Sequence, residues 1–344
     1  MAGGKNVLIV GPGFIGWNVL DLLLTEGYSV TGYARRQEHA KQLEASGAST
    51  VLGDLDDTQK ITDLTLQYDI VIHTATADHK PSAEAIVAGV AERAKQGKET
   101  IYIHTSGTSV LDDGAQGQFQ GDKIYHDDKR EEIDSVPDDA PHRPIDLSIV
   151  RAQQALGTKA KIAIMVPPLI YGFNPKHKRL TIQIPTITRF ALKHGYAPHL
   201  GKGLSVESQI HVLDLARAYI VLLHWIEQAD PQELLDNPYF FCENGVEKSW
   251  LEVATEVGKG LYAAGKIQDP TPKTVPEDKY EDLFGPFSSA VIGLNSRSRA
   301  VRLRKLGWEP REKGVWESYR EDELPELLRE EGKEFHGYAG TAAS

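Results

Sequence analysis

The fold is decided by the stretch Val7-Leu8-Ile9-Val10-Gly11-Pro12-Gly13-Phe14-Ile15-Gly16. Its first four residues are apolar and of strand length, and a helical pattern of apolar residues follows from Trp17 to Leu24. Three glycines spaced G-x-G-x-x-G lie at the turn between strand and helix, where a dinucleotide pyrophosphate binds. Gly11 permits the tight turn, Gly13 lets the backbone approach a phosphate, and Gly16 lets the helix and the strand pack closely.

The first turn of the helix predicts an anion site. Its unpaired N–H groups and partial positive charge favour a negatively charged ligand. We therefore expect Phe14 and Ile15 to contact the cofactor together with the three glycines. A glycine-rich turn without a ligand is the alternative, and the strand before the motif and the helix after it count against that alternative.

The end of the second predicted strand, at residues 29–34, selects between NAD and NADP. In NAD-binding proteins an acidic residue roughly 20 positions past the glycines binds the ribose 2′-hydroxyl. Here Ala34 is followed by Arg35 and Arg36, which offer positive charge to a 2′-phosphate. We predict NADP as the cofactor, with a pair of solvated arginines at a helix start as the alternative.

Strands and helices alternate through the first half of the chain. This alternation predicts the α/β class, with a doubly wound parallel sheet. Further strand patterns lie at 50–55, 69–76, 100–108 and 161–166. We expect cofactor contacts from residues at the ends of these strands, namely Asp54, Leu55, Thr74, Ala75, Thr105 and Pro167.

The composition is that of a globular chain with a negative charge balance. The 344 residues carry a formal net charge of −11, which argues against nucleic acid or an anionic membrane as a partner. There is no run of 18 apolar residues, and the first strand begins too near Met1 for a signal peptide, so we expect a cytoplasmic protein. Cys242 is the only cysteine, which excludes a disulfide framework and a cysteine-based zinc site, and we predict no metal.

The chain divides into two parts and a tail. Residues 1–170 form the predicted NADP-binding domain, within which 111–141 is polar and irregular. Residues 171–336 form mainly a smaller α+β substrate domain that is partly interleaved with the first part. Residues 337–344 are predicted to be a loose tail.

Helix caps and a basic helix are predicted in the second part. Asp214 is expected to cap a helix at 215–227. Ser249 is expected to cap another, with Glu252 completing a capping box. A basic helix is expected at 296–306.

Seven different short motifs follow one another along nearly the whole chain. They are Gly11–Gly16, Gly53–Leu55, Val71–Ala75, Tyr102–Ser106, Pro167–Gly172, Ile210–Ala216 and Leu306–Pro310. In this order they resemble the extended short-chain dehydrogenase/reductase superfamily, in its epimerase/dehydratase-type and NmrA-like branches. The resemblance implies an N-terminal Rossmann domain, a C-terminal substrate domain, a catalytic Ser or Thr, and a Tyr and a Lys spaced Tyr-x-x-x-Lys on one helix.

The catalytic positions of that superfamily are altered in this chain. His142 and Asp146 fall at the positions of the tyrosine and the lysine, at the start of the helix that leads into the proline turn. Gly107 falls at the position of the catalytic Ser or Thr. Ser106 or Thr108 replaces that hydroxyl only if the alignment shifts by one residue.

Two candidates for the proton donor stay open. His142 with Asp146 forms either a base and the carboxylate that orients it, or an ordinary polar pair at a helix start. Tyr125 and Lys129 form a Tyr-x-x-x-Lys pair, and they lie too far ahead of the proline turn to match the family. Tyr125 would supply a phenol if the irregular segment folded over the nicotinamide.

We expect an NADP(H)-binding oxidoreductase or isomerase that acts on a small, largely apolar carbonyl or imine compound. A nucleotide sugar is not expected, because residues 204–208 contain no basic residue to hold a diphosphate. Lys176, Lys178 and Arg179 are anion holders in one interpretation and a solvated surface in the other. The alternative functions are an NADP(H)-sensing regulator without turnover and a non-redox catalyst that keeps NADP as a structural platform. The expected partner is a small molecule, and a homodimer stays open.

Overall fold

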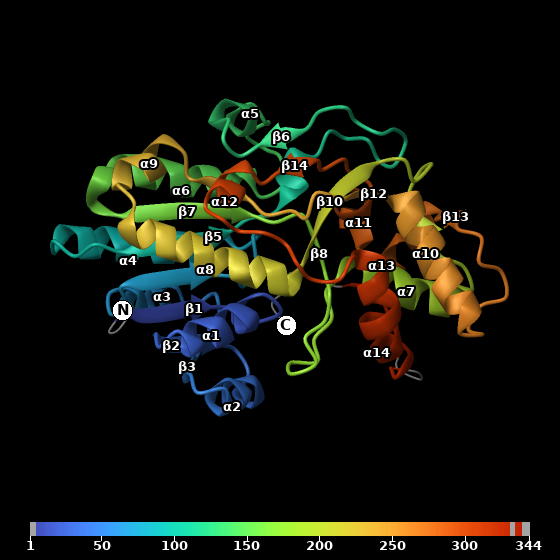
Figure 1. The fold of residues 1–344 in the computed structure, drawn as a ribbon, viewed down its shortest axis with the longest axis horizontal. Coiled ribbons are helices and arrows are strands. Elements are labelled where there is room, and N and C mark those ends of the chain that lie inside the picture. The colour runs from blue at the N-terminus through green and yellow to red at the C-terminus, as the bar shows by residue number, and fades with distance from the viewer. Residues whose placement is uncertain (1–4, 331–333, 339–344) are drawn as a thin grey trace.

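A seven-stranded parallel sheet lies at the centre of the structure, a computed structural model that describes residues 5–330 and 334–338 (Figure 1). Neighbouring strands pair in parallel throughout this sheet. In order across it, the strands are β11 (Tyr239–Phe241), β7 (Lys161–Val166), β5 (Ile101–Thr105), β4 (Ile70–His73), β1 (Asn6–Val10), β2 (Ser29–Ala34) and β3 (Ser49–Leu52). The predicted doubly wound sheet is confirmed. Its strand order reverses at β1, so β1 and β4 flank the crevice where ligands bind in such folds.

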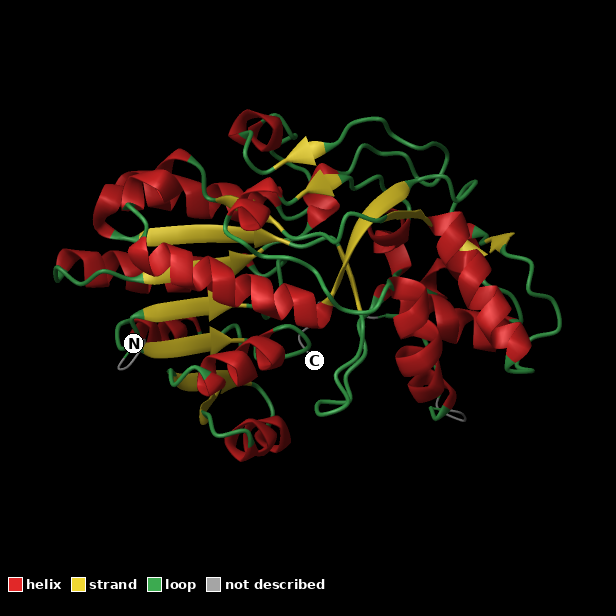
Figure 2. Ribbon diagram, in the orientation of Figure 1, coloured by secondary structure: helices red, strands yellow, loops and turns green. Residues whose placement is uncertain are grey.

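Helices cover both faces of the sheet (Figure 2). On one face lie α3 (Thr58–Thr65), α4 (Lys80–Lys95) and α6 (Arg143–Leu156), and on the other lie α1 (Gly16–Thr25), α2 (Gln37–Ala45) and α8 (Val212–Gln228). Because both faces are covered, the central strands are rich in apolar residues on both sides. The four apolar residues of β1 are fully buried, as the opening sequence predicts.

A smaller unit packs beside the carboxyl ends of these strands. Its sheet consists of β12 (Glu247–Ser249), β10 (Val206–His211) and β8 (Leu169–Tyr171). Helices α7 (Gln183–His194) and α10 (Trp250–Ala263) contribute to a second hydrophobic core. The chain crosses between the two units more than once, because α8 and β11 follow β10 in sequence yet pack in the first core.

The segment at 111–141 is only partly irregular. It contains β6 (Tyr125–His126) and α5 (Arg130–Asp134), and β6 pairs in parallel with β14 (Ser298–Arg299). The basic helix predicted at 296–306 is shorter than expected, because β14 occupies its first part and α12 (Val301–Lys305) the rest. The remaining short elements are α9 (Pro231–Asp236), α11 (Ser288–Ile292), α13 (Val315–Ser318), α14 (Leu324–Leu328), β9 (Pro198–His199) and β13 (Lys273–Thr274).

One of the two predicted helix caps is wrong and the other is confirmed. Strand β10 runs directly into α8, so the helix begins earlier than expected and His211 caps it, with Nδ1 accepting from the amide of Leu213 at 3.2 Å. Asp214 lies in the first turn instead. Ser249 and Glu252 form the predicted capping box at the start of α10.

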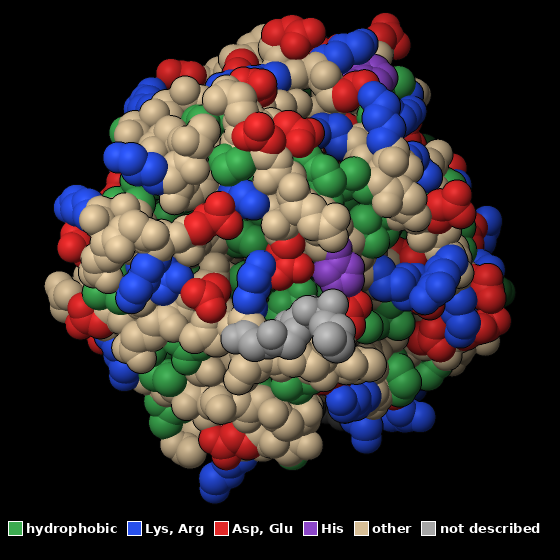
Figure 3. Space-filling model, turned by 60° about the vertical axis from the view of Figure 1, so that its left-hand side comes forward, with side chains coloured by type: hydrophobic (Ala, Val, Ile, Leu, Met, Phe, Trp, Pro, Cys, Tyr) green, Lys and Arg blue, Asp and Glu red, His purple; other side chains and the backbone are tan. Residues whose placement is uncertain are grey.

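The surface carries charges of both signs. Figure 3 shows Lys and Arg side chains interspersed with Asp and Glu across one face of the molecule. Within residues 5–330 and 334–338, no helix is both long enough and apolar enough to cross a membrane. Most of the predicted tail, residues 339–344, lies outside the described residues.

Candidate functional site

The glycine turn after β1 packs directly against the end of β4. Gly11 has a φ of +85°, and a Cβ there would collide with the backbone of Ala75. A Cβ on Gly16 would collide with the hydroxyl of Thr74, which donates to the carbonyl of Gly11 at 2.7 Å. Glycine is therefore required at both positions, for conformation at the first and for space at both.

The amides that follow this turn suit an anion. Among the described residues, no main-chain carbonyl accepts a hydrogen bond from the N–H groups of Phe14, Ile15 or Gly16. The N–H of Gly13 donates to the carbonyl of Gly11 at 2.7 Å, which holds the turn tight. Helix α1 has neither a side-chain cap nor an acidic residue in its first turn. The residues thus fit the pyrophosphate of a dinucleotide, since no group in the described part of the chain competes for the open amides.

The ends of β2 and β3 lie beside this turn in the sheet. The hydroxyl of Tyr33 donates to the carbonyl of Asp54 at 2.7 Å and fixes the turn that contains Asp54 and Leu55. Arg35 and Arg36 are exposed, and Arg36 is the N-cap residue of α2. These positions match those predicted for the adenosine half of the cofactor, and the binding roles stay predictions.

The hydroxyls of Ser106 and Thr108 are used inside the protein. Ser106 is 4% exposed and donates to Asp146 Oδ2 at 2.7 Å. Thr108 is 2% exposed and accepts from the hydroxyl of Ser296 at 2.5 Å. Neither hydroxyl therefore points to a ligand in this structure.

Thr105 and Pro167 are also engaged. The hydroxyl of Thr105 pairs with the hydroxyl of Tyr219 at 2.5 Å, and both side chains are buried. The carbonyl of Pro167 accepts from the amide of Thr108 at 3.0 Å. Both residues lie at strand ends, as predicted, but their polar groups are turned to the protein rather than to a ligand.

His142 is paired with Asp78 rather than with Asp146. Its Nδ1 lies 2.7 Å from Asp78 Oδ1, and because a carboxylate only accepts, the imidazole donates this hydrogen bond. The predicted pairing with Asp146 is wrong for a conformational reason. His142 is the N-cap of α6 and has a φ of +65°, which takes it out of the helix geometry that makes residues i and i+4 neighbours.

The other edge of the imidazole faces Gly107. A Cβ on Gly107 would lie 3.2 Å from His142 Nε2, which is tighter than ordinary contact. The missing side chain at 107 therefore lets the ring approach the carboxyl end of β5. The side chain of His142 is 16% exposed, so the ring is largely shielded from solvent.

Asp78 controls the charge of His142. Burial by itself lowers the pKa of His142. The hydrogen bond and the charge of Asp78, followed by the charge of Asp146 and a hydrogen bond to the backbone of Ala77, outweigh burial and leave the pKa raised. Asp78 keeps its own pKa lowered through the same bond, which outweighs the effect of its partial burial. The pair therefore keeps His142 protonated to a higher pH than an ordinary histidine, and Nε2–H is the proton that it can give to a base.

A row of buried polar side chains lies next to Ser106 and His142, and consists of His73, Tyr102, His104 and Asp146. His73 Nδ1 lies 3.2 Å from His104 Nδ1, and the hydroxyl of Tyr102 lies 3.2 Å from the same atom. His104 Nε2 lies 3.8 Å from Asp146 Oδ1. Burial lowers the pKa of His73 to about 3 and raises that of Asp146 to about 6, so desolvation disfavours charge along the row.

Tyr125 and Lys129 lie elsewhere. Lys129 Nζ pairs with Glu132 at 3.1 Å, and the carboxylate of Asp127 accepts from the amide of Phe241 in β11 at 3.0 Å. These contacts hold the segment at the β11 edge, and Figure 1 shows α5 and β6 on the far side of the sheet from β1. Among the described residues, neither Tyr125 nor Lys129 makes a side-chain hydrogen bond or ion pair with His142.

Sequence reasoning missed Asp78. It is the only carboxylate in the turn between β4 and α4, at the same edge of the sheet as the start of α6. A search for carboxylates at the ends of the parallel strands would have proposed it as a partner of His142.

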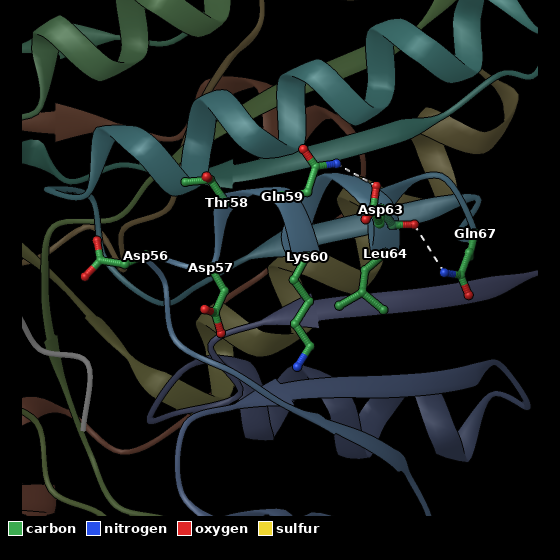
Figure 4. Close-up of a pocket in the computed structure, with 8 residues that line it drawn as sticks. All are labelled: Asp56, Asp57, Thr58, Gln59, Lys60, Asp63, Leu64 and Gln67. Atoms are coloured by element: carbon green, nitrogen blue, oxygen red, sulfur yellow. Dashed lines mark hydrogen bonds between the residues drawn. The ribbon is translucent and has the colours of Figure 1, made fainter.

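A surface hollow of about 670 Å³ lies along α3 (Figure 4). It is lined by Asp56, Asp57, Thr58, Gln59, Lys60, Asp63, Leu64 and Gln67. Lys60 Nζ donates to the carbonyl of Leu52 in the edge strand β3 at 2.5 Å, so the hollow sits at the rim of the sheet. In the part of the chain that the structure describes, no group of three or more His, Cys, Asp or Glu is placed to hold a metal ion.

Comparisons with known proteins agree with this architecture. A model of the family described as NAD dependent epimerase/dehydratase matches residues 7–235. A curated relative named as an oxidase, from an Acremonium species, is 28% identical over 326 residues, which cover 89% of this chain and 93% of the relative. A relative from Stigmatella aurantiaca named as a farnesyl-dihydroquinoline-oxide ketoreductase is 31% identical over 112 residues, 30% of this chain and 34% of its own.

Solved structures share the fold at low identity. A UDP-glucose 4-epimerase from Stenotrophomonas maltophila, solved with NAD and formylated UDP-arabinopyranose, superposes with a TM-score of 0.66. The two chains are 16% identical, with 96% of this chain and 100% of the epimerase covered. A dTDP-glucose 4,6-dehydratase from Bacillus anthracis in complex with NAD has a TM-score of 0.65 at 16% identity, over 95% of this chain and 98% of its own.

Proposed function

This chain belongs to the NAD dependent epimerase/dehydratase family, and from that premise we propose that it is an NADP(H)-dependent oxidoreductase for a small, largely apolar carbonyl or imine compound. The open amides after Gly11 support a dinucleotide, and the guanidinium groups of Arg35 and Arg36 support the phosphorylated form. The names of two relatives, an oxidase and a ketoreductase, support redox chemistry.

His142 is the proposed acid and base. When bound, the nicotinamide donates a hydride to the substrate carbon or accepts one from it. In the reducing direction, His142 Nε2–H gives its proton to the substrate oxygen or nitrogen, while Nδ1–H remains hydrogen-bonded to Asp78. In the oxidising direction, neutral Nε2 takes that proton back. Asp78 orients the ring and stabilises its charged form, so it is a positioning residue.

The observation that carries this proposal is the bond between His142 Nδ1 and Asp78, which directs Nε2 toward the space over Gly107. The burial of Ser106 and Thr108 supports His142 over the two hydroxyls as proton donor. The contacts at the β11 edge support His142 over Tyr125.

Cofactor binding and turnover test the proposal separately. Calorimetry of the unmodified protein should give a lower Kd for NADPH than for NADH, and replacing Arg35 and Arg36 by alanine should weaken NADPH while leaving NADH nearly unchanged. Tighter binding of NADH would refute the cofactor assignment. NADPH should then be consumed with members of a carbonyl and imine panel.

The two alternative functions have their own signatures in the same assays. Tight NADPH binding without consumption, together with a co-purifying protein, would indicate a regulator. Product formed without net change in NADPH would indicate a non-redox catalyst.

A further inference from the structure

A hairpin from the second unit reaches back to the nucleotide-binding turn. Residues 174–179 follow β8 and are closed by a backbone bridge between Asn174 and Arg179. In Figure 1 this hairpin extends from β8 down toward the first turns of α1. Asn174 Nδ2 donates to Asn18 Oδ1 of α1 at 2.7 Å, so the hairpin is attached to the helix that begins at the glycine turn.

Two further contacts fix the hairpin on α1. Lys176 Nζ lies 2.7 Å and His177 Nε2 lies 2.9 Å from the same oxygen, Asp21 Oδ2. His177 is 8% exposed, so this is not a loosely solvated loop. The hairpin therefore has a defined position against the first unit.

Trp17 joins the hairpin, α1 and α2. His177 stacks on its ring, with centroids 4.1 Å apart and planes at 12°. The ring of His39, in the first turn of α2, lies 5.2 Å from the same tryptophan. The guanidinium carbon of Arg179 lies 5.4 Å from the ring centroid of Trp17. The tryptophan thus brings Arg179 to the side of α1 on which α2 begins.

Arg36 shares this location, because it is the N-cap residue of α2 and precedes His39 by less than one helical turn. Electrostatics agree with the geometry. Burial, and then the charge of Arg36, lower the pKa of Arg179. Burial, and then the charges of Arg179 and Arg36, lower the pKa of His39 to about 4. Two guanidinium groups from opposite halves of the chain therefore act on one small region while the histidine beside them stays neutral at pH 7.

We propose that Arg179 completes the binding site for the adenosine 2′-phosphate of NADP(H), together with Arg35 and Arg36. A phosphate accepts several charge-assisted hydrogen bonds, and the guanidinium fork matches its geometry. This inference rests on the proposed NADP(H) binding, and it gives the substrate-side half of the chain a role in choosing the cofactor.

The test compares two neighbouring cations on the hairpin. Arg179→Met keeps an unbranched side chain over Trp17 and removes the charge. Losing a charge-assisted hydrogen bond should raise the Kd for NADPH by roughly 10- to 100-fold in calorimetry, with the Kd for NADH changed less than about twofold. Lys178→Met is the matched control. Lys178 is exposed, and its substitution removes the same charge one position away. It should leave both Kd values within about twofold of the unmodified protein.

The outcomes separate this inference from the function on which it rests. If the unmodified protein does not prefer NADPH, the cofactor assignment fails and the inference fails with it. If NADPH is preferred but Arg179→Met changes both cofactors equally, or changes neither, only the role of Arg179 is refuted. An equal loss in Lys178→Met would also refute it, by showing a diffuse charge effect. Should Arg179→Met not fold, Arg179→Lys keeps the charge without the fork, and it should weaken NADPH selectively by a smaller factor.

Discussion

His142→Gln is the change that tests the proposed chemistry most directly. Glutamine keeps a polar side chain beside Asp78 but cannot exchange a proton near neutral pH. Removing a positioned acid or base reduces turnover by roughly 10²–10⁴-fold. We expect a loss of that order in NADPH consumption, with the Kd for NADPH little changed, because the ring lies over Gly107 rather than at the amides after Gly11.

Removing the charge of Asp78, the carboxylate paired with His142, should also reduce turnover. The bond from His142 to Asp78 is 2.7 Å long, but the side chain of Asp78 is 53% exposed, so solvent weakens it. We place its contribution at the lower end of the range for bonds to charged groups, about 1.5 kcal/mol, which is roughly tenfold in rate. Asp78→Asn should therefore reduce turnover by about tenfold.

The pH profile gives the sign of the effect. Asp78 raises the pKa of His142, so protonated His142 persists to higher pH in the unmodified protein. The reducing rate should fall as the pH rises through that pKa, and Asp78→Asn should move the fall to lower pH. The oxidising rate should show the opposite limb. NMR titration of the His142 imidazole follows the same shift without a substrate.

Two results would refute this reasoning. If Tyr125→Phe abolishes turnover while His142→Gln has no effect, the segment at 111–141 supplies the acid and the Asp78–His142 pair is structural. If Asp78→Asn leaves the pH profile and the imidazole titration unchanged, Asp78 does not control the ring.

Three further predictions concern binding and stability. Gly11→Ala places a methyl group against Ala75 at a φ of +85°. Dinucleotide binding should therefore be lost in calorimetry, and the free energy of unfolding should fall by about 1 kcal/mol or more. An unchanged affinity for NADPH would contradict this prediction. Burial raises the pKa of Glu207 to about 8 from its ordinary 4.5, so the unfolded chain releases this proton first and the folded state loses stability as the pH rises from about 4.5 to 8. Glu207→Gln should remove that loss, appearing more stable than the unmodified protein at pH 8 in thermal unfolding, and an equal difference at pH 4 and pH 8 would contradict it. Ser249→Ala breaks the capping box with Glu252 and should lower the free energy of unfolding in urea by about 1 kcal/mol, whereas an unchanged midpoint would show that the cap is redundant.

Structural features that depend on residues close together in the chain were predictable from the sequence. The turn at Gly11, the parallel sheet and the capping box at Ser249 depend on contacts within a few positions of the chain or on repeated strand patterns. Such signals give the identity of each element and the edge of the sheet where a site forms.

The pairing of side chains across the site was not predictable in this way. Asp78 and His142 are 64 positions apart, and the helix rule that suggested Asp146 fails because His142 has a left-handed conformation. The sequence left Arg179 open as an anion holder or as part of a solvated surface, and the contacts around Trp17 are what place it near Arg36. Both facts depend on tertiary packing, which overrides local spacing.

The repeated crossing of the chain between its two units has a consequence for recombination and design. Residues after β10 return to the first core as α8 and β11 before the chain goes back to β12. A single crossover near residue 170 would therefore exchange the second unit together with the edge strand β11 and with helix α8, which packs against α1. The residues that determine specificity in such a protein do not form one contiguous segment of the chain. It can be exchanged between relatives only by several coordinated breakpoints, or by point changes that leave the borrowed helix and strand in place.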